Sequence, residues 1–462
     1  MHDPSPRELP KSPPIAHTPP VPEGFGPKPL IGSPHIDSLL RPLVRVRDRV
    51  APALAYKQYS RLWQANAGSQ VAFWMQQVAQ GWLVLDLTGS EFTLGLLAFF
   101  RSIPMLLLSP LGGVLADRLD RRRMVLVAQL ILAGLMLTIA ILVVTNQVHV
   151  VHLAVSSLVV GTMFAVNVPA RTALVAGLVP RQHLANAIGL HSATLNSARI
   201  IGPSLAGQVI ATVGIAGSYF VQVGGYVWSS VNMLRVVPPP RSPRPRSSTW
   251  ADMRGGFAYV ARTRIMLALM LLALGPSLFG MPLMTLLPAF VRKDLGGGPE
   301  AFGFLLGVLG VGALVGSALV VTFSRFREKG RALVAAILVY AALLVLLAFT
   351  RSFAAAAVVV AFMGFSQSVY MSVNQMALQL LVPDALRGRV MALRMMTFGL
   401  SPLGLLPLSV IAEVQGTPTA ILLGGLATAV VGIGVPLWVR DIWRLRPDDA
   451  DPDGLAAPRT TG

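Results

Sequence analysis

The sequence predicts an all-α integral membrane protein with twelve transmembrane helices, divided into two halves of six helices each. The first observation is composition: 54% of the 462 residues are hydrophobic and only 13% are charged, and the mean hydropathy is +0.64. A soluble domain of this length does not need so much apolar surface. The second observation is that apolar runs of about 20 residues, the length that spans the hydrocarbon core of a bilayer, recur along the chain. The third is an internal repeat that relates the two sets of runs.

The amino-terminal segment carries no long apolar run. Residues 1–34 are rich in proline, so they cannot bury enough surface to fold and are expected to form an extended, disordered cytoplasmic tail. In residues 35–54 leucine and valine alternate with arginine. This pattern is typical of a short amphipathic helix on the anionic inner leaflet, but a solvated basic linker would show the same pattern. We assign residues 1–55 to this tail.

The predicted spans fall between Arg61 and Arg440. The first half, residues 56–236, contains spans at 61–86, 92–117, 122–145, 149–178, 184–213 and 216–236. Residues 237–264 form a Pro/Arg-rich cytoplasmic linker that ends in a short amphipathic segment. The second half, residues 265–440, contains spans at 265–290, 300–324, 331–350, 353–381, 386–414 and 418–439, and residues 441–462 form a cytoplasmic tail.

Basic residues in the short loops predict the orientation of the chain. The loops assigned to the outside carry only Arg292, Lys293 and Arg351, whereas the other loops and the linker carry most of the arginines. Short basic loops stay on the cytoplasmic side, so both termini are expected in the cytoplasm. The formal net charge of +18 has the same origin. Because these charges form no continuous basic face, no nucleic-acid partner is expected.

An internal repeat supports the division into halves. A shift of 203 residues lays Gly161 on Gly364 and Leu178-Val179-Pro180 on Leu381-Val382-Pro383. Near the second span the shift becomes 208, which lays Gly95 on Gly303. Two homologous halves of this kind are related by an axis along the membrane normal.

The loop between the second and third predicted spans is short and strongly charged. From Gly113 to Arg122 it reads GVLADRLDRR and joins two apolar runs directly. This pattern, G-x-L-A-D-R-x-x-R-R, resembles the signature loop of the major facilitator superfamily, with Asp120 where the family usually has glycine. The resemblance implies the major facilitator fold, in which the substrate site lies between the halves near the bilayer midplane.

The resemblance also implies a conformational gate at this loop. A carboxylate at the inner end of the second span would face the positive N-terminal end of the eleventh span, after Pro383, and hold the two halves together on the cytoplasmic side. The alternative is a loop whose charges only set the topology. The residues assigned to the gate are Gly113, Asp117, Arg118, Arg121 and Arg122.

The fifth span resembles a second motif of the superfamily. Its sequence, GLHSATLNSARIIGPSLAGQ, matches the fifth-span motif of the antiporters, with alanine replacing two of the glycines. Small residues let two helices pack closely, and proline disturbs the helix, although both are also common in ordinary membrane helices. The motif indicates export. The residues assigned to it are Gly189, Gly202, Pro203 and Gly207.

Charged residues inside the spans are candidates for substrate binding or coupling, because a charge there is costly unless it faces a cavity or a partner. Arg101, Arg171 and Arg199 lie within the second, fourth and fifth spans. We expect Arg101 to pair with Asp86 or with an anionic substrate, whereas Arg171 could instead snorkel to the interface. Asp86 and Glu413 close spans on the outer side. Either carboxylate could couple export to proton entry, or could simply mark a helix end.

The first span is unusually rich in glutamine and also carries Trp74, Met75 and Trp82. Uncharged hydrogen-bonding groups among aromatics and Met suit a pocket for a sizeable amphipathic molecule. For any single glutamine, hydrogen bonding between helices is the simpler interpretation. Trp74, Gln77 and Gln80 are the candidates from this span.

Several function classes are excluded or disfavoured. The chain has no cysteine, its histidines show no metal-ligand spacing, and it contains no P-loop, so no metal, cofactor or ATP-driven pump is expected. Within the superfamily the chain most resembles the siderophore (enterobactin) exporter and macrolide-efflux branch. The resemblance implies a monomeric exporter of a small organic molecule in the bacterial inner membrane, driven by proton antiport. The alternatives are a proton-coupled importer of a sugar or organic acid, a lipid translocator and, less favoured for lack of a catalytic constellation, a membrane enzyme.

Overall fold

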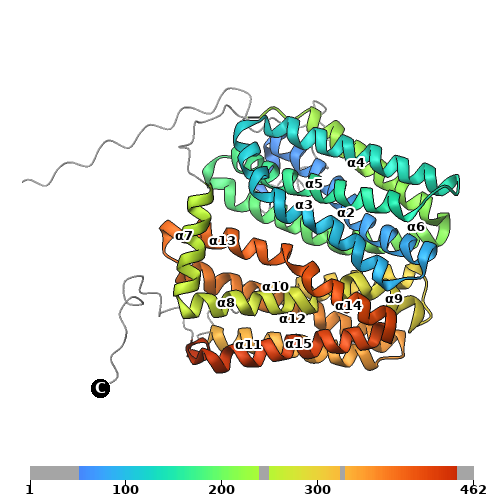
Figure 1. Ribbon diagram of the computed structural model, residues 1–462. Coiled ribbons are helices and arrows are strands. Elements are labelled where there is room, and N and C mark those ends of the chain that lie inside the picture. Colours follow the sequence, from blue (N-terminus) through green and yellow to red (C-terminus); the bar gives the residue numbers. More distant parts are fainter. Residues whose placement is uncertain (1–50, 239–248, 323–327, 445–462) are drawn as a thin grey trace, which may run out of the picture.

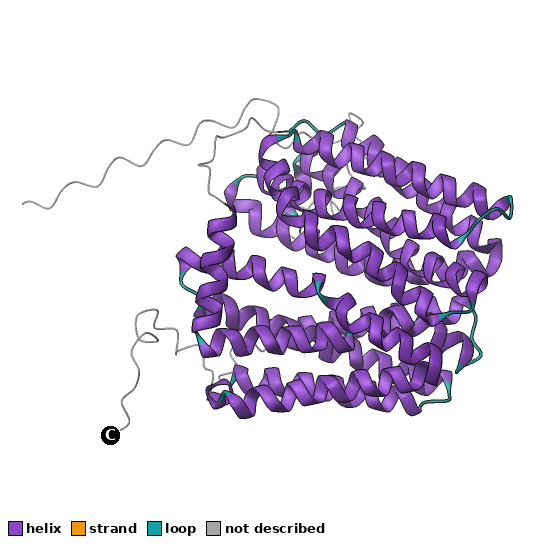
Figure 2. Ribbon diagram, in the orientation of Figure 1, coloured by secondary structure: helices purple, strands orange, loops and turns teal. Residues whose placement is uncertain are grey.

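The computed structural model describes residues 51–238, 249–322 and 328–444, and these ranges contain helices but no strand (Figure 2). The expected helix at 35–54 and both tails lie almost wholly outside the described residues. What is described of them is a 3-10 turn at each end, η1 over Pro52–Ala55 and η3 over Arg440–Arg444.

The first half of the chain forms six membrane crossings from five helices. The helices are α2 (Lys57–Thr88), α3 (Glu91–Arg118), α4 (Arg121–Val144), α5 (Val150–Gly177) and α6 (Arg181–Leu234). α6 contains the fifth and sixth crossings, because the backbone turns at Gly214, whose φ of 85° lies in the region that favours glycine. The two spans predicted at 184–213 and 216–236 therefore meet at this glycine.

The second half begins after a short helix in the linker, α7 (Thr249–Arg262), which matches the expected amphipathic segment. Its seventh crossing is interrupted by a π-helical turn and its eleventh is divided in two. The elements are α8 (Arg264–Gly275), η2 (Pro276–Gly280), α9 (Pro282–Lys293), α10 (Pro299–Thr322), α11 (Lys329–Phe349), α12 (Phe353–Leu381), α13 (Asp384–Gly399), α14 (Ser401–Gln415) and α15 (Thr417–Trp438).

Nine stretches among the described residues are long and apolar enough to cross a membrane, with α6 counted once although it crosses twice. α2 and the α13–α14 pair fall short of that measure; α2 carries many glutamines, and α13 and α14 are short and separate. With α6 counted as two crossings, the chain has the twelve-span arrangement that the sequence predicts.

The two halves lie side by side as separate layers of helices (Figure 1). α2–α6 form one layer and α8–α15 form the other, with α7 crossing between them at one end. We call that end, at the left of Figure 1, the linker end; it also carries the α3–α4 turn. The opposite end, where α2, α9 and α14 terminate, is called the far end.

Packing inside each half repeats in space what the sequence repeats along the chain. A side chain at Gly161 in α5 would collide with the backbone of Arg101 in α3, and one at Gly364 in α12 would collide with the backbone of Leu309 in α10. The same shifts of 203 and 208 residues relate both members of these pairs. Glycine at each point lets two helix backbones touch.

Side chains also define the turn between α3 and α4. The Asp120 carboxylate accepts a hydrogen bond of 2.9 Å from the Arg123 backbone N–H and so caps the start of α4. Aspartate is a preferred N-cap residue, which gives a local reason for its presence where the superfamily motif usually has glycine. The Arg122 guanidinium donates to the carbonyls of Met233 and Leu234 at the end of α6, where a cation is favoured.

Candidate functional site

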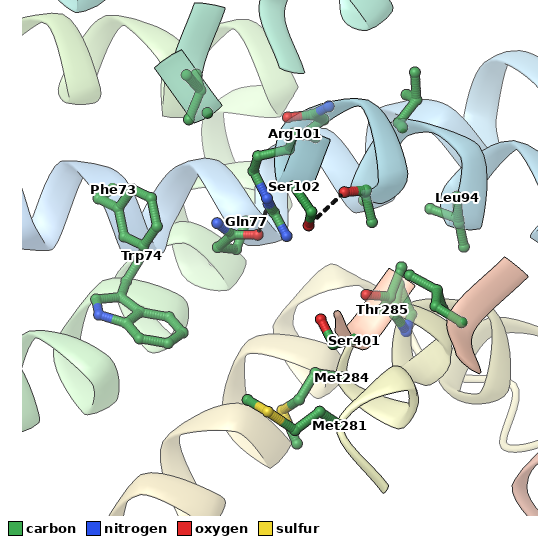
Figure 3. A pocket seen from close by; sticks show the side chains of 18 of the residues that line it. Phe73, Trp74, Gln77, Leu94, Arg101, Ser102, Met281, Met284, Thr285 and Ser401 are labelled. Carbon is green, nitrogen blue, oxygen red and sulfur yellow. Dashed lines mark hydrogen bonds between the residues drawn. The ribbon is translucent and has the colours of Figure 1, made fainter. Parts of the chain in front are cut away.

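A cavity of about 290 Å³ lies between the two halves. Its first wall comes from α2, α3, α5 and α6, and its second from Met281, which lies between η2 and α9, and from α9, α10 and α14. In Figure 3 the side chains of Trp74, Gln77 and Arg101 face those of Met284 and Ser401 across this space. The substrate site expected between the halves therefore has a physical counterpart.

Arg101 and Gln77 together form the polar part of the first wall. The Arg101 guanidinium donates a very short hydrogen bond to the Gln77 side-chain oxygen, and both residues line the cavity (Figure 3). Gln80 also touches the cavity, but it donates to Ser157 of α5 at 2.6 Å and accepts from Gln76 at 2.7 Å. Gln80 thus makes the helix-to-helix contact that was the simpler interpretation of the glutamines.

Arg199 connects the two halves beside the cavity. Its guanidinium carbon lies 5.5 Å from the ring centre of Trp74 in α2, a cation–π distance. The same group donates to the Gln367 side-chain oxygen of α12, in the other half, at 3.0 Å. Trp74 therefore faces both the cavity and a cation, as an aromatic wall residue can.

Arg171 is placed apart from this cavity. It is 5% exposed and donates to Asn167 and to Ser69, each at 2.8 Å. It lines a smaller adjoining cavity of about 40 Å³, which shares Phe73 and Phe164 with the large one. The alternative that Arg171 snorkels to the interface is wrong, because side-chain oxygens inside the half already satisfy it.

The second wall contains residues that the sequence reasoning did not identify. Met281, Met284 and Thr285 come from the seventh crossing, and Ser401 comes from the eleventh (Figure 3). Both crossings are irregular at this point, with the π-helical turn η2 before α9 and the break between α13 and α14. Such turns occur often at functional sites. The proline and glycine of PSLFG, residues 276–280, are the sequence signal that could have indicated it.

At the far end, ion pairs join the two halves. The Asp86 carboxylate pairs with Arg292 of α9 at 2.5 Å, and the buried Glu91 carboxylate pairs with Lys293 at 2.7 Å. The expected pairing of Asp86 with Arg101 is therefore wrong. Asp86 ends α2 at the far end, whereas Arg101 lies almost three turns into α3 and bonds to Gln77.

Glu413 adds a third contact between the halves at the far end. Its carboxylate at the end of α14 accepts hydrogen bonds from the Ser90 hydroxyl at 2.9 Å and from the Phe92 backbone N–H at 3.1 Å. Glu413 thus caps α3 from the other half, where the helix start favours an anion. We call the pairs of Asp86 and Glu91 and this cap the far-end latch.

Asp294 lies beside the latch, just after α9. Its Oδ2 atom is buried and, among the described residues, has no hydrogen-bond partner. The pKa of Asp294 is raised, chiefly because the carboxyl group is buried. The positive charges of Arg351 and Lys293 lower the pKa and the negative charge of Glu91 raises it, but burial is the largest effect. The latch region therefore holds a carboxyl group that releases its proton less readily than an ordinary aspartate does.

The fifth-span motif divides between two contacts. A side chain at Gly202 would press on Trp74, with its Cβ 2.6 Å from that of the tryptophan. A side chain at Gly207 would lie 2.6 Å from the carbonyl oxygen of Pro299 in α10, and the Pro203 carbonyl faces Gly303 of the same helix. By contrast, Gly189 has open space around it. The motif thus lets α6 pack closely against α2, beside the cavity, and against α10 of the other half.

The gate residues are only partly described. The backbone of Gly113 and Asp117 belongs to α3, but their side-chain environments lie outside the described residues. The neighbouring Gly112 lets α3 approach the Ala165 backbone of α5. Arg118 is exposed, and Arg121 donates to the Ala116 carbonyl at 3.0 Å. Within the described residues, no three His, Asp or Glu side chains converge as a metal site requires.

Comparison with protein families accounts for this architecture. Residues 49–451 match the family described as transmembrane secretion effector. The chain belongs to this family of the major facilitator superfamily. This confirms the resemblance and the fold class inferred from the α3–α4 loop. Members are multi-pass membrane transporters rather than enzymes.

Several bacterial relatives resemble this transporter over most of their length. The multidrug efflux pump Tap of Mycolicibacterium fortuitum is 26% identical, covering 80% of this chain and 93% of the relative. The staphyloferrin A transporter of Staphylococcus aureus is 24% identical, covering 78% and 90%. Macrolide efflux protein A of Streptococcus pyogenes is 24% identical, covering 82% and 95%.

Solved structures show the same fold. A bacterial homologue of the human lysosomal transporter Spinster superimposes on this transporter with a TM-score of 0.67 at 15% identity, covering 84% of this chain and 98% of the other. At this identity the likeness establishes the arrangement of the helices.

Proposed function

We propose that this protein exports a small organic molecule, siderophore-like or drug-like, across the bacterial inner membrane by proton antiport. The proposal rests on the cavity between the halves. The far-end latch joins the same two halves beyond one end of this cavity. A site that alternates between two sides needs a cavity at the contact of two rigid halves and a closure that can break. The cavity and the latch supply these two elements.

The direction of transport rests on two supports. Several relatives are named for efflux, and the fifth span carries the antiporter-like motif, whose Gly207 and Pro203 contact α10 of the other half. An importer of an organic acid is the second candidate, because two arginines line or flank the cavity. The compounds retained by cells with and without the protein, and their uptake by everted vesicles, separate the two directions.

The orientation of the protein follows from its charges. Arginines concentrate in the linker and in the loops at the linker end, so we place that end in the cytoplasm, together with the tails of residues 1–55 and 441–462. The two transport halves are residues 56–236 and 265–440, joined by the linker of residues 237–264. The latch then faces the outside, and the protein works as a monomer because its cavity is complete within one chain.

Proton coupling is assigned to the acidic groups of the far end. Among the described residues that line the cavity there is no Asp or Glu, whereas Asp86, Glu91 and Glu413 all take part in the latch. Protonation of such a carboxylate removes half of an ion pair that joins the halves. A proton arriving from outside would thus favour opening toward the outside, as an antiporter requires.

The proposal is tested with bacterial cells that lack or carry the gene, by measuring which compounds they retain. Cells lacking the protein should retain at least one small organic compound that cells carrying it lose, and everted vesicles should take up that compound when the interior is acidified. The Asp86→Asn variant should lose the dependence on the pH gradient. Retention that is identical in both strains, or a compound that accumulates only when the protein is present, would contradict export.

A further inference from the structure

The described lining of the cavity contains two arginines and no Asp or Glu. Arg101 and Arg199 line it, and their hydrogen-bond partners are the neutral side chains of Gln77 and Gln367. Within residues 51–238, 249–322 and 328–444, neither arginine forms an ion pair with a carboxylate. The latch acids are occupied elsewhere, by Arg292 and Lys293.

Unpaired guanidinium groups at this depth are costly, because a charge removed from water needs an opposite charge or a full set of hydrogen bonds. Inside a membrane protein such a charge usually marks a site that handles a ligand or an ion. A purely neutral cavity would avoid this cost. The two arginines therefore require a reason beyond packing.

The internal repeat indicates that the fold itself does not need these charges. The shifts that relate the halves place Leu309 at the position of Arg101 and Pro402 at the position of Arg199. At the first pair the local packing is the same in both halves, since Gly161 touches the Arg101 backbone and Gly364 touches the Leu309 backbone. One half thus builds the same helix contact with an apolar residue, and the positive charge is confined to the first wall.

The rest of the lining suits an amphipathic molecule with one acidic group. Hydroxyls from Ser102, Thr285 and Ser401 stand near the polar part of the cavity (Figure 3). Aromatic rings and methionines form part of the apolar lining: Phe73, Trp74, Phe164, Phe302, Met281 and Met284. Rings and Met side chains accommodate a flat apolar body, whereas arginine and hydroxyl groups bind carboxylate oxygens.

We propose that Arg101 and Arg199 form an anion-binding site, and that the substrate of this transporter is an organic acid with an aromatic or otherwise apolar body. The acidic group binds between the two guanidinium groups, and the body lies against the methionine-rich second wall. Arg171, in the adjoining smaller cavity that shares Phe73 and Phe164, extends the positive lining toward the linker end. This inference rests on the proposed export function and names the substrate class of the same site.

The site is tested with two dyes that share a xanthene frame and carry opposite charge, the anion fluorescein and the cation rhodamine 6G. Full-length protein in lipid nanodiscs is titrated with each dye, with empty nanodiscs as background. We expect saturable binding of fluorescein that weakens about tenfold or more in Arg101→Gln and in Arg199→Gln, because each removes a charge-assisted hydrogen bond. Rhodamine 6G should bind the natural protein more weakly than fluorescein does.

Two further variants distinguish loss of the site from loss of the fold. Arg101→Lys keeps the charge and should retain more of the fluorescein affinity than Arg101→Gln does. Arg394→Gln removes a buried guanidinium, 4% exposed, that binds Asn374 and does not line the cavity. This matched control should leave fluorescein binding unchanged in whatever fraction of the protein elutes as a single species.

Three results would overturn the anion site: no saturable binding of fluorescein, tighter binding of rhodamine 6G, or fluorescein binding that survives both glutamine substitutions. Export itself is measured separately in cells. If cells export a cation or a neutral compound through this protein, the anion site is wrong while the export function stands. If nothing is exported but fluorescein binds through Arg101, the export function is wrong while the anion site stands.

Discussion

Two sets of charged side chains lie between the halves of the described structure and have different surroundings. Arg101 and Arg199 have neutral partners and line the cavity, whereas Asp86 and Glu91 have cationic partners at the far end. A charge paired with an opposite charge across the halves can stabilise the contact between them. A charge whose partners are neutral can attract a charged ligand. Substitutions at the two groups are therefore expected to affect different steps.

Asp86 is the residue at which coupling is most directly tested. Asp86→Asn removes the carboxylate that pairs with Arg292 at 2.5 Å, so protonation can no longer switch this contact. We expect gradient-driven transport to be abolished, while exchange of substrate down its own gradient continues. Both rates are measured in proteoliposomes with and without a pH difference. Gradient-driven efflux that persists in both Asp86→Asn and Glu413→Gln would show that coupling runs through another group.

Asp294 predicts how stability depends on pH. Because burial holds its pKa above the ordinary 3.8, the folded protein binds this proton more tightly than the unfolded chain. Its contribution to stability is complete below pH 3.8 and is lost as the pH rises through the folded-state pKa. Asp294→Asn should thus raise Tm at pH values above the folded-state pKa and flatten the decline of Tm as the pH rises above 3.8. Asp441→Asn, an exposed acid at the linker end, serves as the control, and an equal effect there would refute the assignment.

α6 shows how one helix serves both the cavity and the contact between halves. Its residues near Gly202 touch Trp74 of α2, and those near Gly207 touch α10 of the other half. Close packing of this kind depends on the absence of a side chain at particular points. The glycines of one motif should therefore differ in how well they tolerate substitution.

Gly207 and Gly189 provide a matched pair within the same helix. Gly207→Ala puts a methyl group 2.6 Å from the Pro299 carbonyl oxygen and is expected to separate α6 from α10, lowering Tm and slowing transport. Gly189→Ala meets open space and should stabilise the helix by about 0.5–1 kcal/mol, since alanine is the better helix former. Thermal unfolding and transport assays measure both effects. Equal changes of Tm and of transport rate in the two variants would contradict the role of close packing at Gly207.

The α3–α4 turn carries the proposed gate. Asp117→Asn should cut transport strongly while expression and folding stay near normal, because the neutral side chain loses an attraction to a helix start of about 0.3–2 kcal/mol. Transport in vesicles and elution of the purified protein test the two parts of this expectation. Asp120→Asn is the matched control, since asparagine also caps α4 well. Unchanged efflux in Asp117→Asn would remove the gate role.

The two halves are expected to move as rigid bodies around the cavity, so the latch must open in every cycle. The chain contains no cysteine, which makes cross-linking of a single introduced pair unambiguous. Ser90 and Glu413 touch across the latch, with 2.9 Å between their side-chain oxygens. Linking Ser90→Cys to Glu413→Cys with a short thiol-reactive cross-linker that a reductant cleaves should stop exchange of substrate down its own gradient, and the reductant should restore that exchange.

A second cysteine pair controls for the chemistry. Gln58 of α2 accepts a hydrogen bond of 3.0 Å from the backbone N–H of Val237, which follows α6. This contact does not cross between the halves, so linking Gln58→Cys to Val237→Cys should leave transport unchanged. The single-cysteine variants should also be unaffected by the cross-linker. Full transport through a protein linked completely across the latch would contradict alternation of the two halves.

The sequence by itself determined the twelve spans, the division into two halves and the family. Span length and hydropathy are local properties of the chain, and the repeat and the α3–α4 motif are visible as patterns of residues. It also indicated Arg101, Trp74 and Gln77 as candidates, because a charge inside a span tends to face a cavity or a partner, and glutamine among aromatic residues suits a pocket. The break of α6 at Gly214 falls between two spans that hydropathy had already separated.

Only the tertiary structure decided which of these residues meet. Asp86 and Arg292 are 206 residues apart in the chain, and their contact depends on how each helix is rotated and how the halves are placed. The same reason explains why the predicted pairing of Asp86 with Arg101 is wrong. It also explains why the sequence did not indicate Met284 and Ser401 in the second wall of the cavity. Hydropathy defines where a helix crosses the membrane, but not which of its faces looks into the space between two halves.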